Sequence, residues 1–224
     1  MISIAIDGPS GAGKSTIARM VAGRLGYLYV DTGALYRTIA LFFLRHGVDV
    51  EDGAAVGQAL GQIQVELRYR DGEQQVFLNG ENVNGEIRGD DISQMAAAVS
   101  PLPVVREFLL GLQRDMAKKD NVVMDGRDIG TVVLPEAQVK IYLTASAVQR
   151  AKRRCDEYRA KGIACDYEEL LNSVMERDLK DTTRAISPLR QAEDAELIDT
   201  TYNTLEESVN LITDYVTRKI ASLG

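Results

Sequence analysis

Short, continuous apolar runs alternate along the chain with longer segments in which apolar residues recur every three to four positions. Continuous runs are typical of strands buried on both faces of a parallel sheet, whereas the three-to-four spacing is typical of helices with one buried face. The predicted strands cover residues 2–7, 27–30, 121–125, 139–143 and 196–199. The alternation predicts an α/β fold in three layers, with a five-stranded parallel sheet.

Start and stop signals bound the helices between these strands. Pro103 suits the first turn of a helix, and Gly47 and Gly162 suit the position just after one. Thr204 and Glu207 form a T-x-x-E capping box for a last helix. The other helices are expected after the first strand, where apolar residues recur at steps of four, and at 34–45, 52–62, 91–98, 103–118, 146–161 and 166–180.

The pattern changes to a period of two between the second and third predicted strands of the sheet. Residues 63–69 alternate apolar and polar, Asp71-Gly72 is a hairpin turn signal, and 75–78 is the return strand. Asn79-Gly80 offers a second turn before 81–83. A β-meander here predicts a small lobe inserted into the main domain.

Composition narrows the class of protein. A chain of 224 residues with 45% apolar and 26% charged residues suits one core with a small inserted lobe. The net charge of −7 argues against broad nucleic-acid binding. No apolar run approaches the roughly 20 residues that span a bilayer, and the N-terminus lacks an export signal. We therefore expect a cytoplasmic monomer without nucleic-acid or membrane partners.

The cysteines and the single histidine do not suggest a metal site. Cys155, Cys165 and His46 are too few for a Cys/His zinc site, so both cysteines are expected to be free thiols. His46 precedes Gly47, which indicates the C-terminal residue of a helix rather than a catalytic group.

The strongest motif is G-x-x-x-x-G-K-S directly after the first predicted strand. Glycines let backbone N–H groups turn toward an anion, and the helix that follows adds its positive N-terminal end. Lys14 would reach the β- and γ-phosphates of a nucleoside triphosphate, and the Ser15 hydroxyl would hold Mg²⁺. The residues concerned are Gly8, Pro9, Ser10, Gly11, Ala12, Gly13, Lys14 and Ser15.

Two further strand ends carry polar groups that should face the same cleft, because ligands of open α/β sheets bind beyond the carboxyl ends of the strands. In the first, Thr32 is either a helix cap or a ligand contact, and Arg37 either points to solvent or meets an anion. In the second, Asp125 is either a turn acid or a carboxylate near Mg²⁺. Arg127 and Asp128 either pair with each other or serve a ligand.

Arginines are dense after the fourth strand. The stretch 150–154 is either a solvated helix face or a phosphate-binding surface, and Arg177 and Asp181 are spaced as an ordinary i, i+4 surface pair. With Arg184 and Arg190, they supply the bidentate donors that a phosphorylated acceptor requires.

Several of these stretches together are similar to the bacterial-type cytidylate kinases, a group of nucleoside monophosphate kinases. The similarity covers nearly the whole chain. It rests on the phosphate loop extended by Asp7 and Thr16, and on residues 31–37 (D-T-G-A-L-Y-R), 80–83, 103–106, 125–133 (D-G-R-D-I-G-T-V-V), 176–178 with Asp181 and Arg184, and 187–189.

The resemblance implies a role for each matched residue. Lys14, Arg127 and Arg184 are the implied catalytic residues. The phosphate loop through Thr16 and the lid residues Arg150, Arg153 and Arg154 bind ATP. The acceptor nucleotide is met by Thr32, Arg37, Arg106, Arg127, Asp128, Arg177, Asp181 and Arg184: Arg37, Arg127 and Arg184 on its phosphate, Arg106 and Asp128 on cytosine, and Arg177 and Asp181 on the ribose side.

The implied activity is ATP-dependent phosphorylation of CMP and dCMP, with Mg²⁺ at Ser15 and Asp125 nearby. The implied domain pattern has a core at about 1–36, 104–149 and 166–224, a monophosphate-binding insertion at about 37–103, and a lid at about 150–165. Ala97 stands where the family often has a base-contacting Ser, and Ser93, Ser100 or a water would have to replace that contact.

Two alternatives remain from the sequence alone. One is a kinase of the same fold that acts on another monophosphate or a small alcohol. The other is a nucleotide switch, for which the chain lacks the guanine-reading N-K-x-D segment.

Overall fold

The computed structural model describes residues 1–70 and 73–223, and the predicted Asp71-Gly72 turn lies outside them. Its main sheet has the strand order β2-β6-β1-β7-β8 and every neighbouring pair is parallel. These strands are β1 (Ser3–Asp7), β2 (Leu28–Asp31), β6 (Val122–Gly126), β7 (Val139–Thr144) and β8 (Glu196–Asp199). The prediction of a five-stranded parallel sheet is confirmed.

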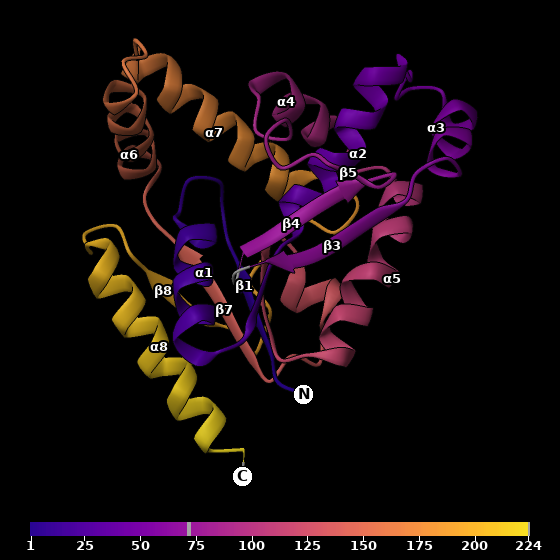
Figure 1. Ribbon diagram of the computed structural model, residues 1–224. Helices are drawn as coiled ribbons and strands as arrows, with labels where there is room; N and C mark the ends of the chain where they lie inside the picture. The colour runs from indigo at the N-terminus through magenta and orange to yellow at the C-terminus, as the bar shows by residue number, and fades with distance from the viewer. Residues whose placement is uncertain (71–72, 224) are drawn as a thin grey trace.

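Alternate residues of the central strand face opposite layers. Ile4 and Ile6 pack with α1 (Lys14–Leu25) and α8 (Leu205–Ala221) through Val21 and Ile212. Ala5 packs on the other side with the layer that includes α5 (Pro103–Lys119) and the π-helical turn η1 (Ile129–Val133). Because β1 is buried on both faces, its sequence is continuously apolar. Figure 1 shows α1 and α8 on one side of the sheet and α5 on the other.

The inserted lobe packs around a second apolar core, which includes Val105 and Leu109 of α5. It contains most of α2 (Thr32–His46), α3 (Gly53–Leu60), the antiparallel strands β3 (Val65–Arg70), β4 (Glu73–Leu78) and β5 (Glu81–Asn82), and α4 (Asp90–Val99). Its apolar cluster includes Ile39, Phe43, Val76, Leu78 and Ile92. The meander predicted from the period-two pattern is therefore present, and it forms a separate three-stranded sheet.

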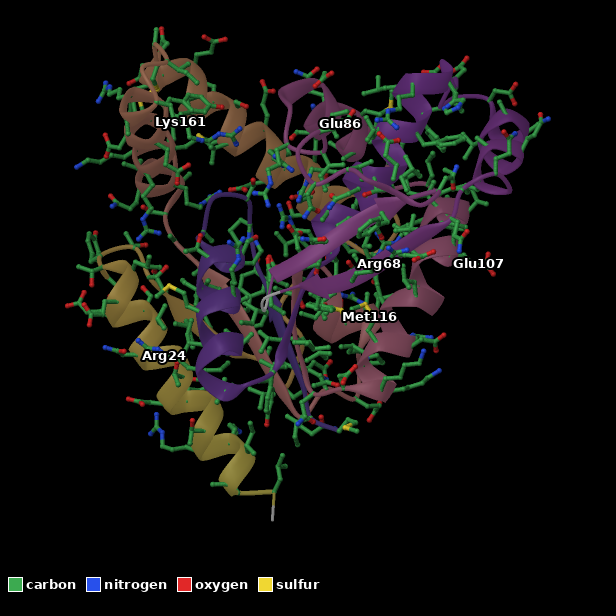
Figure 2. The ribbon with its side chains drawn as sticks, in the orientation of Figure 1. Arg24, Arg68, Glu86, Glu107, Met116 and Lys161 are labelled. Atoms are coloured by element: carbon green, nitrogen blue, oxygen red, sulfur yellow. A yellow bond between two sulfur atoms is a disulfide. The ribbon has the colours of Figure 1, made fainter. Side chains whose placement is uncertain are left out.

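The remaining two helices form a hairpin at the top of Figure 1. They are α6 (Ala147–Ala160) and α7 (Tyr167–Thr183), and the chain ends lie at the opposite, lower end of the molecule. Figure 2 shows Lys161 at the outer end of this hairpin and Glu86 on the insertion. The two projections stand over the end of the sheet at which the parallel strands finish.

Local signals position the helices as expected. Gly47 follows α2 with a φ of 60°, Ser146 and Asp166 accept hydrogen bonds from the first turns of α6 and α7, and Thr204 and Glu207 complete the capping box of α8. Among the described residues, no single helix has the length and apolar composition of a membrane span; only the bent pair Asp91–Val99 and Pro103–Lys119, at 97°, meets that test when joined.

Candidate active site

The loop after β1 has the backbone of a phosphate cradle. Gly11 and Gly13 have φ values of 77° and 88°, which glycine adopts without strain. Gly8 is required for another reason, because a Cβ there would collide with the carbonyl oxygen of Leu143. Lys14 is the first residue of α1 and only 5% exposed, and its ammonium group donates to the Pro9 carbonyl at 2.7 Å. The loop therefore presents a buried cation and a helix N-terminus together.

Asp125, near the end of β6, joins two neighbouring elements. Its carboxylate accepts a hydrogen bond from Ser15 Oγ at 2.9 Å and one from the Tyr29 hydroxyl at 2.8 Å. Burial raises the pKa of Asp125 to about 6, so the carboxylate is mostly ionised at neutral pH. The prediction that Asp125 lies near Ser15 agrees with this geometry.

The hydroxyl and carboxylate of this pair fit a hard cation such as Mg²⁺, which prefers oxygen ligands. In residues 1–70 and 73–223 there is no cluster of three or more His, Cys, Asp or Glu side chains that would hold a metal alone. A Mg²⁺ ion here would need phosphate oxygens to complete its coordination, as is usual for this ion beside nucleotides.

The end of β2 contributes the next group. Asp31, not Thr32, caps α2, because its carboxylate accepts from Ala34 N at 2.9 Å. Thr32 Oγ1 instead donates to the Asp125 carbonyl at 2.7 Å, so the interpretation of Thr32 as a cap was wrong. Arg37 donates from Nη2 to Asp31 at 2.9 Å, while its buried Nε has no hydrogen-bond partner among the described residues. A buried unpaired donor is costly, which favours the anion interpretation of Arg37.

The second charged cluster gathers around Asp128. Arg106 from α5 hydrogen-bonds the Asp128 carboxylate, and Arg184 Nη2 lies 3.9 Å from its other oxygen. Burial raises the pKa of Asp128, and the two guanidinium groups oppose that rise. Arg184 Nε donates to the Ser187 carbonyl at 2.7 Å, but within residues 1–70 and 73–223 the buried Nη2 has no hydrogen-bond partner.

Two pairings expected from sequence proximity are absent from the described residues. Arg127 does not pair with Asp128; its Nε donates to Asp181 at 2.8 Å. The same contact replaces the expected i, i+4 pair of Asp181 with Arg177. Both interpretations were wrong because β6 ends beside α7, which brings residues 54 positions apart into contact. Burial and the nearby Arg127 lower the pKa of Arg177, which therefore belongs to the same cluster.

The arginines of α6 divide by position. Arg150 is only 4% exposed. It donates to Ala145 O, to Ser10 O of the phosphate loop and to the carboxylate of Asp178 on α7. Arg150 therefore links the phosphate loop to both α6 and α7. Arg153 donates to Thr200 O at 2.6 Å, and Arg154 contacts Tyr158. Arg190, by contrast, is exposed. The solvated-face interpretation of this stretch was wrong for Arg150.

A cavity of about 290 Å³ lies between the phosphate loop and the lid. Its lining is mainly cationic and comes from the loop, the insertion and α6: Gly11, Arg88, Ser93, Arg150, Arg153, Arg154, Glu157, Tyr158 and Lys161. The predicted ATP-binding arginines therefore share one cavity with the loop. A second cavity, of about 200 Å³, includes Tyr36 and Arg106 in its lining.

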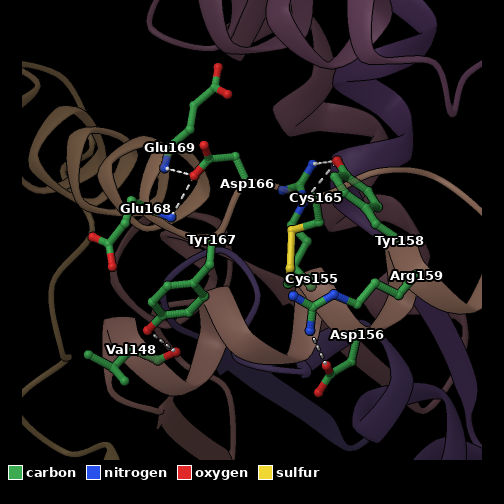
Figure 3. The surroundings of a disulfide bond; sticks show 11 residues. Val148, Cys155, Asp156, Tyr158, Arg159, Cys165, Asp166, Tyr167, Glu168 and Glu169 are labelled. Carbon is green, nitrogen blue, oxygen red and sulfur yellow. Dashed lines mark hydrogen bonds and ion pairs between the residues drawn. A yellow bond between two sulfur atoms is a disulfide. The ribbon is translucent and has the colours of Figure 1, made fainter.

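The expectation of free thiols was wrong. Cys155 and Cys165 form a disulfide with a Cα–Cα distance of 5.6 Å. The chain reverses after α6 at Gly162, whose φ is 73°, and this turn brings Cys165 back against the helix. Figure 3 shows the bridge between the end of α6 and the start of α7, next to the Asp166 cap.

The position of the expected base-contacting Ser is exposed. Ala97 lies on the surface of α4, and the hydroxyls of its two candidate replacements bond to their own helix: Ser93 Oγ to Gly89 O at 2.9 Å and Ser100 Oγ to Ala97 O at 3.4 Å. Ser93 also lines the 290 Å³ cavity. The structure thus brings Ser93 nearer to the cleft than Ala97.

Sequence reasoning missed three partners of the site. Tyr29 orients Asp125, Asp178 holds Arg150, and Asp31 caps α2 while pairing with Arg37. Asp31 and Asp178 both stand inside stretches that carry the family resemblance, so their charge beside an Arg was an available signal. Tyr29 gave no signal beyond a polar tip in a buried strand.

Known proteins resemble this chain over nearly its whole length. A family model described as cytidylate kinase matches residues 4–218. A cytidylate kinase of Carboxydothermus hydrogenoformans is 50% identical over 216 residues, covering 96% of this chain and 97% of that one. A cytidylate kinase of Lactobacillus johnsonii is 45% identical over 219 residues, covering 98% and 95%.

Solved structures show the same fold at low identity. An uncharacterized protein from Eubacterium ventriosum has a TM-score of 0.53 at 12% identity, covering 97% of this chain and 99% of that one. A gluconokinase from Sinorhizobium meliloti has a TM-score of 0.50 at 16% identity, covering 99% and 95%.

The parallel sheet, the phosphate loop after its central strand and the cationic cleft above it define a P-loop kinase fold. Within that class the match to relatives extends over nearly the full length of the chain. The chain belongs to the cytidylate kinase family.

Proposed function

We propose that this protein transfers the γ-phosphate of ATP to CMP and dCMP, giving ADP and CDP or dCDP. One observation carries the proposal: relatives named cytidylate kinase match at 45–50% identity along almost the whole chain. The cleft supports it, because a phosphate loop on one side faces a cluster of buried arginines on the other.

The donor side binds ATP through the loop. Backbone N–H groups of residues 10–13 and the N-terminus of α1 surround the phosphates, and Lys14 supplies a cation at the transferring group. Burial and the nearby Arg127 lower the pKa of Lys14. Bound phosphates oppose that effect, because their negative charge favours the ammonium form. Thr16, Arg153 and Arg154 complete the ATP site, and Arg150 positions the loop.

The acceptor side binds the monophosphate through arginines. Arg37, Arg127 and Arg184 meet its phosphate, and the unpartnered Arg37 Nε and Arg184 Nη2 supply donors for it. Arg106 and Asp128 read cytosine. Thr32, Arg177 and Asp181 contact the rest of the nucleotide.

Catalysis in this arrangement needs no general base. The acceptor is a phosphate whose second pKa is about 6, so its oxygen is already anionic at neutral pH. Positioning and charge neutralisation then carry the reaction, with Lys14, Arg127 and Arg184 as the catalytic cations. The single histidine is consistent with this: His46 lies at the end of α2 with Nδ1 2.8 Å from Phe42 O.

Mg²⁺ is the proposed cofactor. When bound, it would supply positive charge that offsets the negative charge developing on the phosphates during transfer. Ser15 and Asp125 would hold it, since their oxygen atoms adjoin at 2.9 Å beside Lys14.

We propose that the chain divides at the boundaries that the resemblance implies. We assign the core to about 1–36, 104–149 and 166–224, the monophosphate-binding insertion to about 37–103, and the lid to about 150–165. Closure of the lid over ATP would exclude water from the transfer.

We also propose a monomer in the cytoplasm. Both halves of the cleft come from one chain, so no second copy is needed to complete the site. The Cys155–Cys165 disulfide speaks against a cytoplasmic location, because disulfides are rare in reducing compartments such as the cytoplasm. Alkylation of the two cysteines in fresh extracts reports whether the bridge is closed there.

A coupled ADP-release assay tests the function. Purified protein with ATP and Mg²⁺ is offered CMP, dCMP, UMP, AMP or dTMP in separate reactions. CMP and dCMP should give the highest kcat/KM. Acceptor-independent ADP release, or a preference for AMP or dTMP, would contradict the proposal.

A further inference from the structure

Asp7 is a buried carboxylate that none of the steps above uses. It is the last residue of β1, directly before Gly8 of the phosphate loop, and it is 5% exposed. Its two oxygens face away from the loop toward the end of the neighbouring strand β6. Oδ1 accepts from Ile129 N at 2.8 Å and Oδ2 accepts from Gly130 N at 2.7 Å.

These two amides begin the π-helical turn η1. The first N–H groups of a helical turn lack partners within it and need an external acceptor. Asp128 at the cap position of η1 gives no side-chain hydrogen bond, since its carboxylate is engaged by Arg106. Asp7 therefore caps η1 from another strand, 122 and 123 residues away in sequence.

Close packing holds this contact in place. A Cβ added at Gly130 would lie 3.4 Å from Asp7 Oδ2 and 3.2 Å from Lys140 Cδ, tighter than an ordinary contact for the latter. The backbones are also in register, because Asp7 pairs with Gly126 across β1 and β6. Arg127 and Asp128 thus lie between Gly126, which pairs with Asp7 in the sheet, and Ile129, whose amide binds the Asp7 carboxylate.

The charge of Asp7 suits two amide donors. Burial raises the pKa of Asp7 to about 6, while the bonds from Gly130 and Ile129 oppose that rise. The negative charge of Asp128 raises the pKa of Asp7 further, and the positive charge of Lys14 lowers it. At neutral pH the ionised carboxylate accepts both bonds, which a neutral amide side chain does not do.

We propose that Asp7 is a positioning residue for the acceptor nucleotide, holding Arg127 and Asp128 in place from the strand that carries the phosphate loop. The inference rests on the proposed function, since it concerns the acceptor that these two residues meet. Asp7 would then connect the two halves of the cleft. It is the last residue of β1, directly before the phosphate loop, and its carboxylate holds the first amides of η1, which follow Arg127 and Asp128.

Asp7→Asn is the informative substitution. Asn has nearly the same shape but only one acceptor oxygen, so one of the two amides would face an NH₂ group and lose its bond. A lost buried hydrogen bond of this kind corresponds to roughly a tenfold change in an equilibrium constant. We expect KM for CMP to rise about tenfold and the CMP-to-UMP ratio of kcat/KM to fall, while KM for ATP changes less than about threefold.

Asp52→Asn is the control for the change from carboxylate to amide. Asp52 also accepts two backbone amides, from Ala54 and Ala55, but both bonds go to its Oδ1, which Asn keeps, and it caps α3 on the exposed side of the insertion. The same chemical change there should leave both KM values and the CMP-to-UMP ratio as in the wild type. Gly130→Ala is a second variant, because it disturbs the same contact from the other side and should shift the ratio in the same direction.

The outcomes separate the two proposals. Wild-type protein without CMP-dependent turnover would overturn the proposed function and this inference with it. Wild-type activity on CMP, with CMP KM and the CMP-to-UMP ratio unchanged in Asp7→Asn, would overturn the inference alone. If Asp7→Asn does not fold, Gly130→Ala decides: an unchanged ratio in that variant counts against the role of Asp7.

Discussion

The two halves of the cleft are built in different ways. The proposed donor half centres on one contiguous loop, residues 8–15, with backbone amides and a lysine at a helix start, and α6 adds Arg153 and Arg154 to it. The proposed acceptor half is assembled from side chains on α2, α5, β6 and α7, far apart in sequence. The phosphate loop is therefore a property of local sequence, whereas the acceptor half exists only after the sheet has formed.

The halves also differ in how their cations are used. Lys14 donates to the Pro9 carbonyl of its own loop, and Arg150 is fully engaged by the loop and α7. In the described part of the chain, the buried Arg37 Nε and Arg184 Nη2 have no hydrogen-bond partner. Unsatisfied buried donors are costly, so the acceptor half is the side on which a bound anion would add most to stability.

The largest expected effect concerns the donor half. Lys14→Ala removes the cation at the transferring phosphate, and kcat should fall by about 10²–10³. The fold should survive, as measured by far-UV circular dichroism, because β1 and α1 keep their apolar contacts. Coupled ADP release at saturating ATP and CMP measures the loss.

Lys118→Ala is the control for this prediction. Lys118 is an exposed lysine on α5 whose ammonium group pairs with Asp115 at 3.0 Å. Its loss should leave kcat unchanged. A folded Lys14→Ala protein with near-normal turnover would contradict the assignment of the loop lysine.

A smaller effect is expected at Arg37 in the acceptor half. Arg37→Ala removes a charge-assisted donor to the acceptor phosphate, so KM for CMP should rise about 10- to 100-fold with little change in KM for ATP. Arg45→Ala is a control on the same helix, since Arg45 is partly exposed and pairs with Glu81 and Glu86. Equal rises in KM for CMP and KM for ATP in Arg37→Ala would contradict the assignment of Arg37 to the acceptor half alone.

The smallest expected effect concerns specificity within the acceptor half. Asp128→Ala should lower the CMP-to-UMP ratio of kcat/KM by about tenfold, because a carboxylate favours an amine on the base over a carbonyl. ATP binding should change less. Steady-state assays with both acceptors measure the ratio, and Asp115→Ala removes an exposed carboxylate as the comparison. An unchanged ratio in Asp128→Ala would contradict the role of Asp128 in reading cytosine.

The same contrast explains what the sequence predicted well. The strands, the caps at Ser146, Asp166 and Thr204, and the phosphate loop depend on apolar spacing and on contacts within a few residues, so their predicted positions agree with the structure. The Arg127–Asp181 pair, the burial of Arg150 and the role of Thr32 depend on strand order and helix placement. Reasoning from neighbouring residues therefore gave the wrong partner for Arg127, the wrong exposure for Arg150 and the wrong role for Thr32.

The disulfide was missed for a related reason. Two cysteines ten residues apart carry no pairing signal unless the turn between them is known to fold back. The family resemblance implied contacts with the acceptor, but it did not reveal which groups hold those side chains in place. Asp31, Asp178 and Asp7 all make such supporting bonds here, and the bond of Asp7 joins residues more than 120 positions apart.

The bridge between Cys155 and Cys165 has a mechanical consequence. While it is closed, α6 and α7 are covalently linked near their outer ends, so the two helices of the hairpin cannot separate there. The hairpin joins the rest of the chain at its inner ends, through residues 145–146 after β7 and residues 184–188 after α7. The second connection contains Ser187, with a φ of 49°, and Arg184, which lies against Asp128. Any rotation of the linked pair about its inner ends would therefore also shift the arginine beside Asp128.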